Sequence, residues 1–204
     1  MVIPCLTGLA KKAGKWGVER EKISEPVYND VDTGMFRPMT VERSSEFTVA
    51  YAGRRSPEKG VLRLLKVAER LTSVHVLIAG EEQLNISFLS GVEYVGSLPF
   101  SEMPRFYDKA DLVVLPSFTE GFPNVILEAY VCGESVLVAK EAFPEELEVF
   151  GSVCSIDEFE SEICRLKKSD LRPPGRRARS YVKKHYTWEK FGQSLIEHLS
   201  AVVK

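Results

Sequence analysis

The sequence predicts an α/β fold, built as a doubly wound parallel sheet flanked by helices. From Glu46 onward, short apolar segments alternate with segments of helical periodicity, which is the pattern of βαβ units. Several of the short segments are apolar at nearly every position, as strands buried on both faces of a parallel sheet are. Right-handed crossovers bring the carboxyl ends of such strands to one edge of the sheet, where ligands bind.

The predicted strands are rich in β-branched and aromatic residues, and glycines follow several of them. They are Phe47–Ala52, Val74–Ala79, Val92–Val95, Leu112–Leu115, Ser135–Ala139 and the weaker Ser152–Ser155.

The predicted helices carry apolar residues three or four positions apart. Ser101 is expected to cap its helix, and Pro123 is expected in the first turn of another, which Gly133 ends. Trp188 begins an apolar stripe on the last helix, which we interpret as core. The predicted helices are Leu6–Gly17, Lys59–Leu71, Ser101–Lys109, Pro123–Cys132, Pro144–Phe150, Asp157–Leu166, Gly175–His185 and Trp188–Val203.

Composition places the chain among ordinary soluble globular proteins. It has 204 residues, of which 44% are hydrophobic and 27% charged, and its net charge is −2. This balance requires neither nucleic acid nor a membrane as a partner. No apolar run approaches the roughly 20 residues that span a bilayer, and the first residues have the wrong order of apolar and basic groups for a signal peptide.

The cysteines indicate a reducing compartment. Cys5, Cys132, Cys154 and Cys164 stand far apart, without a CxxC pair or a histidine cluster. We therefore expect reduced, mostly buried thiols in a cytoplasmic protein.

The usual phosphate-binding fingerprints are absent. No two of the 14 glycines are two residues apart, so GxG does not occur, and there is no GxxxxGK[ST]. A sheet of this kind must therefore hold its ligand in another way.

The first candidate site is the loop Gly53–Gly60, GRRSPEKG, between the first strand and the first helix after it. It places Arg54 and Lys59 at the carboxyl edge of the sheet, beside a helix N-terminus that attracts anions. Two cations at this spacing can hold a diphosphate. The alternative is a solvated basic turn.

The second candidate site is the segment Pro116–Ala129, PSFTEGFPNVILEA. Glu120 lies in the loop after a strand, Gly121 lets the backbone approach a ligand, and Glu128 lies between one and two turns into the helix. Both glutamates can meet different parts of one extended ligand. Alternatively, Glu120 complements the helix dipole and Glu128 is an exposed carboxylate, although its apolar neighbours make an unpaired charge there costly.

Five motifs in the same order resemble a known family. EGFPNVILE is similar to the signature of retaining glycosyltransferases with the GT-B fold, and most resembles glycosyltransferase family 4, the glycosyl transferases group 1. AGRRSPEKG resembles that family's GRLxxEKG loop, PVYNDVDTGMFRP its linker, EYVGSLPFSEMPRFYDKADLVVLPS the segment before the signature, and HYTWEKF its FSWE segment. The resemblance covers about residues 24–200.

The resemblance implies roles for individual residues. Arg54 and Lys59 would bind the donor diphosphate and offset leaving-group charge, Glu120 would bind the donor sugar and aid the transition state, and Glu128 would bind the ribose. The loop backbone would face the sugar and diphosphate, and the base would lie near Gly96. The implied donor-binding set is Gly53, Arg54, Lys59, Gly96, Glu120, Gly121, Phe122, Pro123, Asn124 and Glu128.

The resemblance also implies a nucleotide-diphosphate sugar, UDP- or GDP-linked, as donor substrate, and no cofactor. Cations and a helix dipole can stabilise the departing diphosphate, so no metal is required, and the sequence has no carboxylate cluster that suggests one. The acceptor would be a glycan or a lipid-linked molecule. Because Gly80 and Val92 are close in sequence, a helix usual in the family is expected to be absent between them.

The implied organisation is a remnant of an N-terminal domain plus a linker over residues 1–45, and a donor-binding Rossmann-like domain with C-terminal helices over residues 46–204. The family's acceptor-binding domain would then be a separate part or subunit. The alternative is a non-catalytic half-enzyme or interaction subunit that needs a separate acceptor-binding partner, and association as a homodimer also stays open. A sugar-nucleotide epimerase is a further alternative, but this chain has no GxG loop, and its Tyr186–Lys190 pair lies far from any strand end.

A basic stretch, Arg165–Lys184, is the remaining feature. A solvated helical face is the favoured interpretation. Attraction to an anionic lipid surface is the alternative, which leaves peripheral membrane contact on the cytoplasmic face open.

Overall fold

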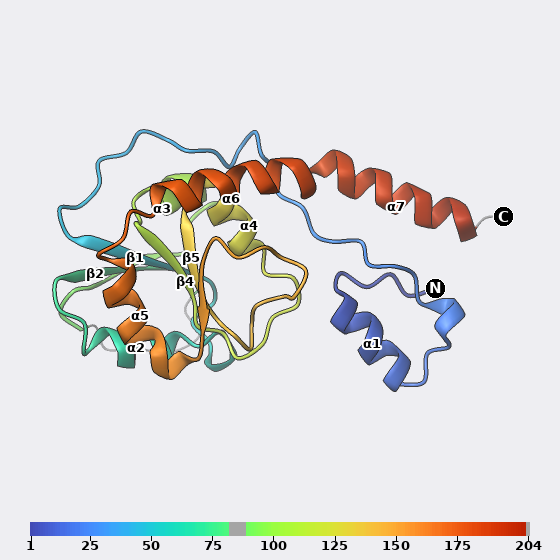
Figure 1. Ribbon diagram of the computed structural model, residues 1–204, viewed down its shortest axis with the longest axis horizontal. Helices are drawn as coiled ribbons and strands as arrows, with labels where there is room; N and C mark the ends of the chain where they lie inside the picture. Colours follow the sequence, from blue (N-terminus) through green and yellow to red (C-terminus); the bar gives the residue numbers. More distant parts are fainter. Residues whose placement is uncertain (82–88, 203–204) are drawn as a thin grey trace.

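The structure is a computed structural model that describes residues 1–81 and 89–202. Within these residues a six-stranded sheet has the order β3-β2-β1-β4-β5-β6, and every neighbouring pair is parallel (Figure 1). The α/β class and the parallel sheet are therefore confirmed. The strands are β1 Phe47–Ala52, β2 Val74–Ala79, β3 Val92–Gly96, β4 Leu112–Leu115, β5 Ser135–Ala139 and β6 Gly151–Cys154.

The strand order creates a switch point between β1 and β4. From β1 the chain moves outward through β2 to β3, and it then returns to the other side of β1 for β4, β5 and β6. The loops that leave β1 and β4 therefore diverge from neighbouring strand ends, and a crevice for a ligand opens between such loops in doubly wound sheets.

Helices cover both faces of the sheet. The helices are α1 Thr7–Lys15, α2 Val61–Ala68, α3 Met103–Asp108, α4 Asn124–Cys132, α5 Phe159–Leu166, α6 Arg172–His185 and α7 Trp188–Val202. α2 and α5 pack on one face, whereas α3, α4 and α6 pack on the other (Figure 1).

β4 shows why its sequence is apolar throughout. Leu112 and Val114 join the core under α2 and α5, and Val113 and Leu115 join the core under α4, because successive side chains of a strand point to opposite faces. A strand covered on both sides has no position left for a polar side chain.

Three helix predictions need correction. Pro144–Phe150 is a run of turns, not a helix. Its backbone is held instead by the buried hydroxyl of Tyr130, which donates to the Glu148 carbonyl (3.1 Å) and accepts from the Phe150 N–H (3.0 Å). Ser101 forms no side-chain cap, because a 3₁₀ turn over Phe100–Glu102 leads into α3. α2 begins at Val61 rather than Lys59, after the left-handed Gly60.

The segment before β1 packs partly on this domain. Val31 and Phe36 are buried in the same core as α3 and α4, whereas α1 lies beyond the end of the sheet, near α7 (Figure 1). The division at residue 45 stays a prediction. The expectation for the chain between Gly80 and Val92 falls mainly on residues 82–88, which lie outside the described residues.

The terminal helix is less buried than predicted. Trp188 is 59% exposed and Leu199 is 48% exposed, because α7 extends past the edge of the sheet (Figure 1). The prediction of mostly buried thiols is also wrong. Only Cys132 is buried, and Cys164 lies on the exposed side of α5, although all four cysteines are free.

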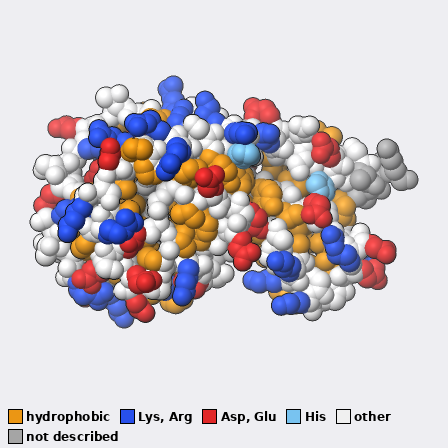
Figure 2. Space-filling model, in the orientation of Figure 1, with side chains coloured by type: hydrophobic (Ala, Val, Ile, Leu, Met, Phe, Trp, Pro, Cys, Tyr) orange, Lys and Arg blue, Asp and Glu red, His pale blue; other side chains and the backbone are white. Residues whose placement is uncertain are grey.

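The predicted basic stretch lies at the end of α5 and along α6. Arg176, Arg177, Lys183 and Lys184 are exposed, and lysine and arginine side chains follow α6 across the surface (Figure 2). Within the described part of the chain, no helix is long and apolar enough to cross a bilayer.

Candidate functional site

The two loops singled out in the sequence meet at the switch point. Gly60 has a φ of +74°, and a Cβ at this position would lie 2.1 Å from the Pro116 carbonyl oxygen. The Phe118 N–H donates to the Glu58 carbonyl (3.0 Å), and Arg63 donates to the Pro116 carbonyl (3.1 Å). Glycine is required at position 60 because a side chain would push the β4–α4 loop away from the β1–α2 loop.

A salt bridge joins the cation of one loop to the carboxylate of the other. The Lys59 Nζ lies 2.7 Å from Glu120 Oε2, and the Ser117 hydroxyl donates to Glu120 Oε1 at 2.7 Å. The Glu120 side chain is only 8% exposed, and that of Lys59 is 25% exposed. Both oxygens of a nearly buried carboxylate therefore have a partner, as a buried charge requires.

Arg54 lies at the same edge but is more exposed. Its guanidinium is 3.7 Å from Glu58, and both side chains are about half exposed (53% and 50%). An exposed pair at this distance contributes little stability, so Arg54 is free to exchange Glu58 for an anionic ligand. Its backbone carbonyl accepts a hydrogen bond from the buried Tyr51 hydroxyl (2.7 Å), which fixes the start of the loop.

Charged side chains of both loops affect the pKa of Tyr51. Burial raises the pKa of Tyr51, and the negative charge of Glu120 raises it further. The hydroxyl therefore stays protonated as a donor to the Arg54 carbonyl.

Gly53 and Gly96 reach this edge through their neighbour Gly80. A Cβ on Gly80 would lie 1.8 Å from the Gly53 carbonyl oxygen, and the Gly80 N–H donates to the Gly96 carbonyl (2.9 Å). The ends of β1, β2 and β3 are thus in close backbone contact.

The loop before α4 offers its backbone rather than its side chains. Gly121 and Asn124 are exposed, whereas Phe122 and Pro123 are buried. The ring of Phe122 packs 5.8 Å from Tyr28 and 5.6 Å from Tyr186, so it points into the core. The N–H groups at the start of a helix precede its ladder of hydrogen bonds and can bind an anion. At the start of α4, the Ile126 N–H donates to the Pro123 carbonyl (3.0 Å), which leaves this role to the N–H groups before it.

Glu128 is not the exposed carboxylate of the alternative interpretation. Burial raises its pKa, and a hydrogen bond from the Tyr107 hydroxyl to Oε2, at 2.6 Å, opposes that rise. Arg54, Lys59 and Glu120 thus lie on the two loops that meet at the switch point, whereas Glu128 lies farther along α4 and pairs with Tyr107 of α3.

Sequence reasoning missed the polar side chains that support these groups. Ser117 lies two residues after the end of β4, a position that could have been considered. Tyr107 looks like any core residue of a helix. Asn29 donates to the Asn124 Oδ1 (2.7 Å) and, more weakly, to the Phe122 carbonyl (3.4 Å). Arg55 is buried, with its guanidinium 3.9 Å above the Tyr94 ring, and no local pattern distinguishes it from Arg54.

A cavity of about 630 Å³ lies at the opposite, amino-terminal edge of the sheet. There Arg43 pairs with Glu134 (2.6 Å), and the Met39 N–H donates to Asp108. These contacts fasten the segment before β1 to the sheet.

No group of three or more His, Cys, Asp or Glu side chains that could hold a metal ion occurs among the described residues.

Comparison with known proteins identifies the family. The profile of the family described as glycosyl transferases group 1 matches residues 46–169. D-inositol 3-phosphate glycosyltransferase of Mycobacteroides abscessus is 31% identical over 111 residues, which are 48% of this chain and 25% of that protein. Lipopolysaccharide 1,2-N-acetylglucosaminetransferase of Salmonella typhimurium is 28% identical over 178 residues, or 73% of this chain and 47% of that protein.

The fold also has solved counterparts. An Anabaena protein, Alr3699/HepE, solved in complex with UDP and glucose, superposes with a TM-score of 0.82 at 18% identity, over 98% of this chain and 63% of that one. The fold is that of one Rossmann-like half of GT-B glycosyltransferases. The chain spans half or less of the length of these curated relatives. Because the family profile matches more than half of the chain, this protein belongs to the glycosyl transferases group 1 family.

Proposed function

We propose that this chain is the donor-binding part of a retaining glycosyltransferase, which binds a nucleotide-diphosphate sugar and transfers the sugar to a glycan or lipid-linked acceptor. The observation that carries the proposal is the Lys59–Glu120 salt bridge at the switch point, between two loops that the fold places at its ligand-binding edge.

The diphosphate would lie against Lys59, Arg54 and the first turn of α4. Transfer of the sugar leaves negative charge on the nucleoside diphosphate, and preorganised cations and N–H groups stabilise that charge without reorganising. Lys59 has a rigid stem position because Gly60 packs on the β4–α4 loop. When the diphosphate binds, Lys59 would exchange one anionic partner for another.

The sugar would lie beside Glu120. Release of Lys59 from Glu120 Oε2 would free that oxygen to accept hydrogen bonds from sugar hydroxyls, while Ser117 keeps Oε1 in place. The backbone N–H groups of Gly121, Phe122 and Asn124 follow Glu120 closely in sequence and would also donate hydrogen bonds to the sugar. A carboxylate next to the anomeric carbon would also favour positive charge that develops there.

The nucleoside would extend toward β2 and β3. Glu128 would accept hydrogen bonds from the ribose hydroxyls, and the base would lie near Gly96, whose carbonyl is tied to the β2 end. A UDP- or GDP-linked sugar fits this assignment, and the site needs no cofactor.

The proposed organisation assigns donor binding to residues 46–204 and the end of an acceptor-binding domain, with its linker, to residues 1–45. The relatives are more than twice as long as the matched portion. Complete transfer would therefore use an acceptor-binding part in addition to this domain.

Isothermal titration calorimetry with UDP, GDP and their sugar conjugates tests the proposal. We expect one of them to bind, and Glu128→Gln to weaken its binding by about 1.5–3 kcal/mol, the value of a hydrogen bond to a charged group. Arg54→Ala should weaken binding of the nucleoside diphosphate but not of the nucleoside. Absence of binding to every member of the panel would overturn the proposal.

A transfer assay separates the enzyme from the non-catalytic alternative. A donor domain of a transferase should release the diphosphate and give a product with retained anomeric configuration once an acceptor-binding partner is present. Nucleotide binding without turnover under any partner condition would favour an interaction subunit.

A further inference from the structure

We infer that Tyr107 is a positioning residue for Glu128: it holds one carboxylate oxygen so that the other faces the ribose of the donor. The inference rests on the proposed function of this site and adds a residue to which the family resemblance assigns no role. Tyr107 lies on α3, outside both candidate loops, and is 21 residues from Glu128 in sequence.

The contact is short and protected. The Tyr107 hydroxyl donates to Glu128 Oε2 at 2.6 Å, and the side chain of Tyr107 has no exposed surface. No described residue forms a hydrogen bond with Glu128 Oε1. One oxygen of the carboxylate is therefore committed to the protein, and the other is available to a ligand.

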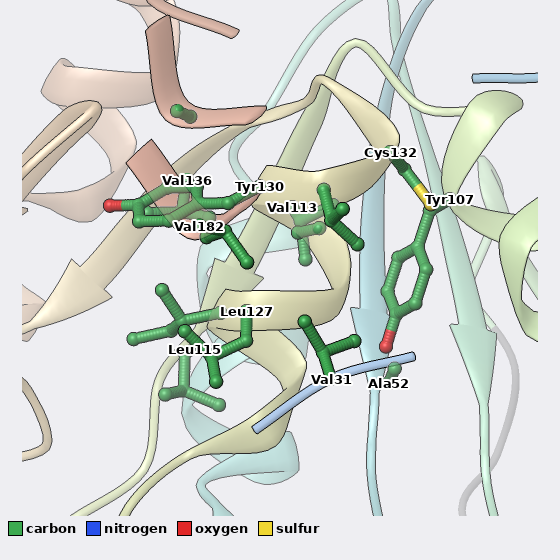
Figure 3. Close-up of a cluster of buried hydrophobic side chains, with 14 of the residues drawn as sticks. Val31, Ala52, Tyr107, Val113, Leu115, Leu127, Tyr130, Cys132, Val136 and Val182 are labelled. Atoms are coloured by element: carbon green, nitrogen blue, oxygen red, sulfur yellow. The ribbon is translucent and has the colours of Figure 1, made fainter. Parts of the chain in front are cut away.

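The ring of Tyr107 is itself fixed. Phe36 lies 6.3 Å away at a 45° angle, and Phe106 lies 5.7 Å away at 67°. Figure 3 shows the Tyr107 hydroxyl pointing toward the end of the core where Ala52, the last residue of β1, lies. The hydroxyl thus reaches the carboxyl edge of the sheet from a rigid ring, and a ring held in this way can define the direction of a flexible glutamate.

The contact also acts on the charge of Glu128. Burial raises the pKa of Glu128, and the Tyr107 hydrogen bond works against that rise, because a donor stabilises the ionised carboxylate. Besides the two partners themselves, the titratable group that acts on this pair among the described residues is the Cys132 thiol, and burial raises the pKa of both Tyr107 and Cys132. Neither carries charge at neutral pH, so the Tyr107 hydrogen bond is the contact that favours the ionised form of Glu128.

Tyr107→Phe tests the inference, because it removes the hydroxyl and keeps the ring. We expect about tenfold weaker binding of the nucleoside diphosphate that the unaltered chain binds, and unchanged binding of inorganic pyrophosphate. The affinity of Tyr107→Phe for the nucleotide should also begin to fall at a higher pH on acidification, because Glu128 loses the donor that favours its ionised form.

Tyr130→Phe is the matched control. Tyr130 is equally buried, and its hydroxyl bonds to the turns before β6 rather than to Glu128. This variant should lose stability but bind nucleotide as the unaltered chain does, with the same pH dependence.

A second variant covers the case in which Tyr107→Phe does not fold. Glu128→Asp keeps the charge but is one methylene too short to meet Tyr107 and the ribose together, so it should bind nucleotide as weakly as Glu128→Gln. Nucleotide affinity equal to that of the unaltered chain in Tyr107→Phe or in Glu128→Asp overturns the inference, while the proposed function stands. Failure of the unaltered chain to bind any nucleotide, or full affinity in Glu128→Gln, overturns the proposed function instead.

Discussion

Replacing Lys59 by alanine should destabilise the fold as well as remove a diphosphate contact. The Lys59–Glu120 distance of 2.7 Å corresponds to a gross attraction of about 6 kcal/mol at an effective dielectric constant of about 20. Desolvation of both charges offsets most of it. The stability lost in Lys59→Ala is therefore mainly the free-energy cost of leaving the Glu120 carboxylate, which is 8% exposed, with the Ser117 hydroxyl as its remaining partner. Full burial would make that cost about 3–5 kcal/mol.

Lys59 is 25% exposed, so water reaches the pair, and we expect a loss of about 2 kcal/mol at pH 8. For a chain of this size that corresponds to a decrease of roughly 4–8 °C in Tm. Thermal and urea unfolding followed by circular dichroism would measure it.

Arg54→Ala is the matched control, because it removes a cation from the same loop. The Arg54 guanidinium lies 3.7 Å from Glu58 and both side chains are about half exposed, so removal of this pair should change stability little. Both variants should weaken diphosphate binding, but only Lys59→Ala should lower stability. Equal stability of the two variants at pH 8 would refute the reasoning.

Two further predictions concern stability. The pKa of Glu134 is raised to about 7 by burial, despite Arg43 beside it, so the stability associated with its protonated form is lost as pH rises from about 4.5 through 7. Glu134→Gln carries no charge at any pH. Its free energy of unfolding, measured with urea, should therefore rise relative to that of the unaltered chain between pH 5 and pH 8.5, by up to about 3 kcal/mol. A difference in unfolding free energy that does not change with pH would contradict this. Gly60→Ala should cost about 3 kcal/mol or more, because its Cβ would meet the Pro116 carbonyl at 2.1 Å in a left-handed conformation, whereas Gly192→Ala, with no atom within 4 Å of the added Cβ, should be tolerated. Comparable Tm values for the two alanine variants would show that the loops can separate at no cost.

Strand positions could be predicted closely because each depends on a local pattern. Phe47–Ala52, Val74–Ala79, Leu112–Leu115 and Ser135–Ala139 have the predicted bounds, since a strand covered on both faces must be apolar along its length. Pro144–Phe150 could not be predicted in this way. Its turns depend on the hydroxyl of Tyr130, whose contact with this segment no local pattern reveals.

The residues of the candidate site also fall into those that local patterns predict and those that they do not. Arg54, Lys59, Glu120 and Glu128 could be named from motifs, because strand ends, glycines and helix starts are visible in a linear sequence. Their partners could not. Ser117, Tyr107 and Asn29 contact the site through side chains whose roles depend on the packing of α3, α4 and the segment before β1.

The amino-acid order alone was therefore enough for the fold class, the family resemblance and the residues of the two loops, since all three depend on local periodicity and spacing. The tertiary structure determines which charged side chains form pairs. Lys59 and Glu120 are 61 residues apart, and they pair because β4 lies beside β1 and Gly60 lets their loops touch. Burial, which arises only when the helices and strands pack, raises the pKa of both Glu128 and Glu134. Electrostatic environment depends on three-dimensional neighbours, and a linear pattern carries no record of them.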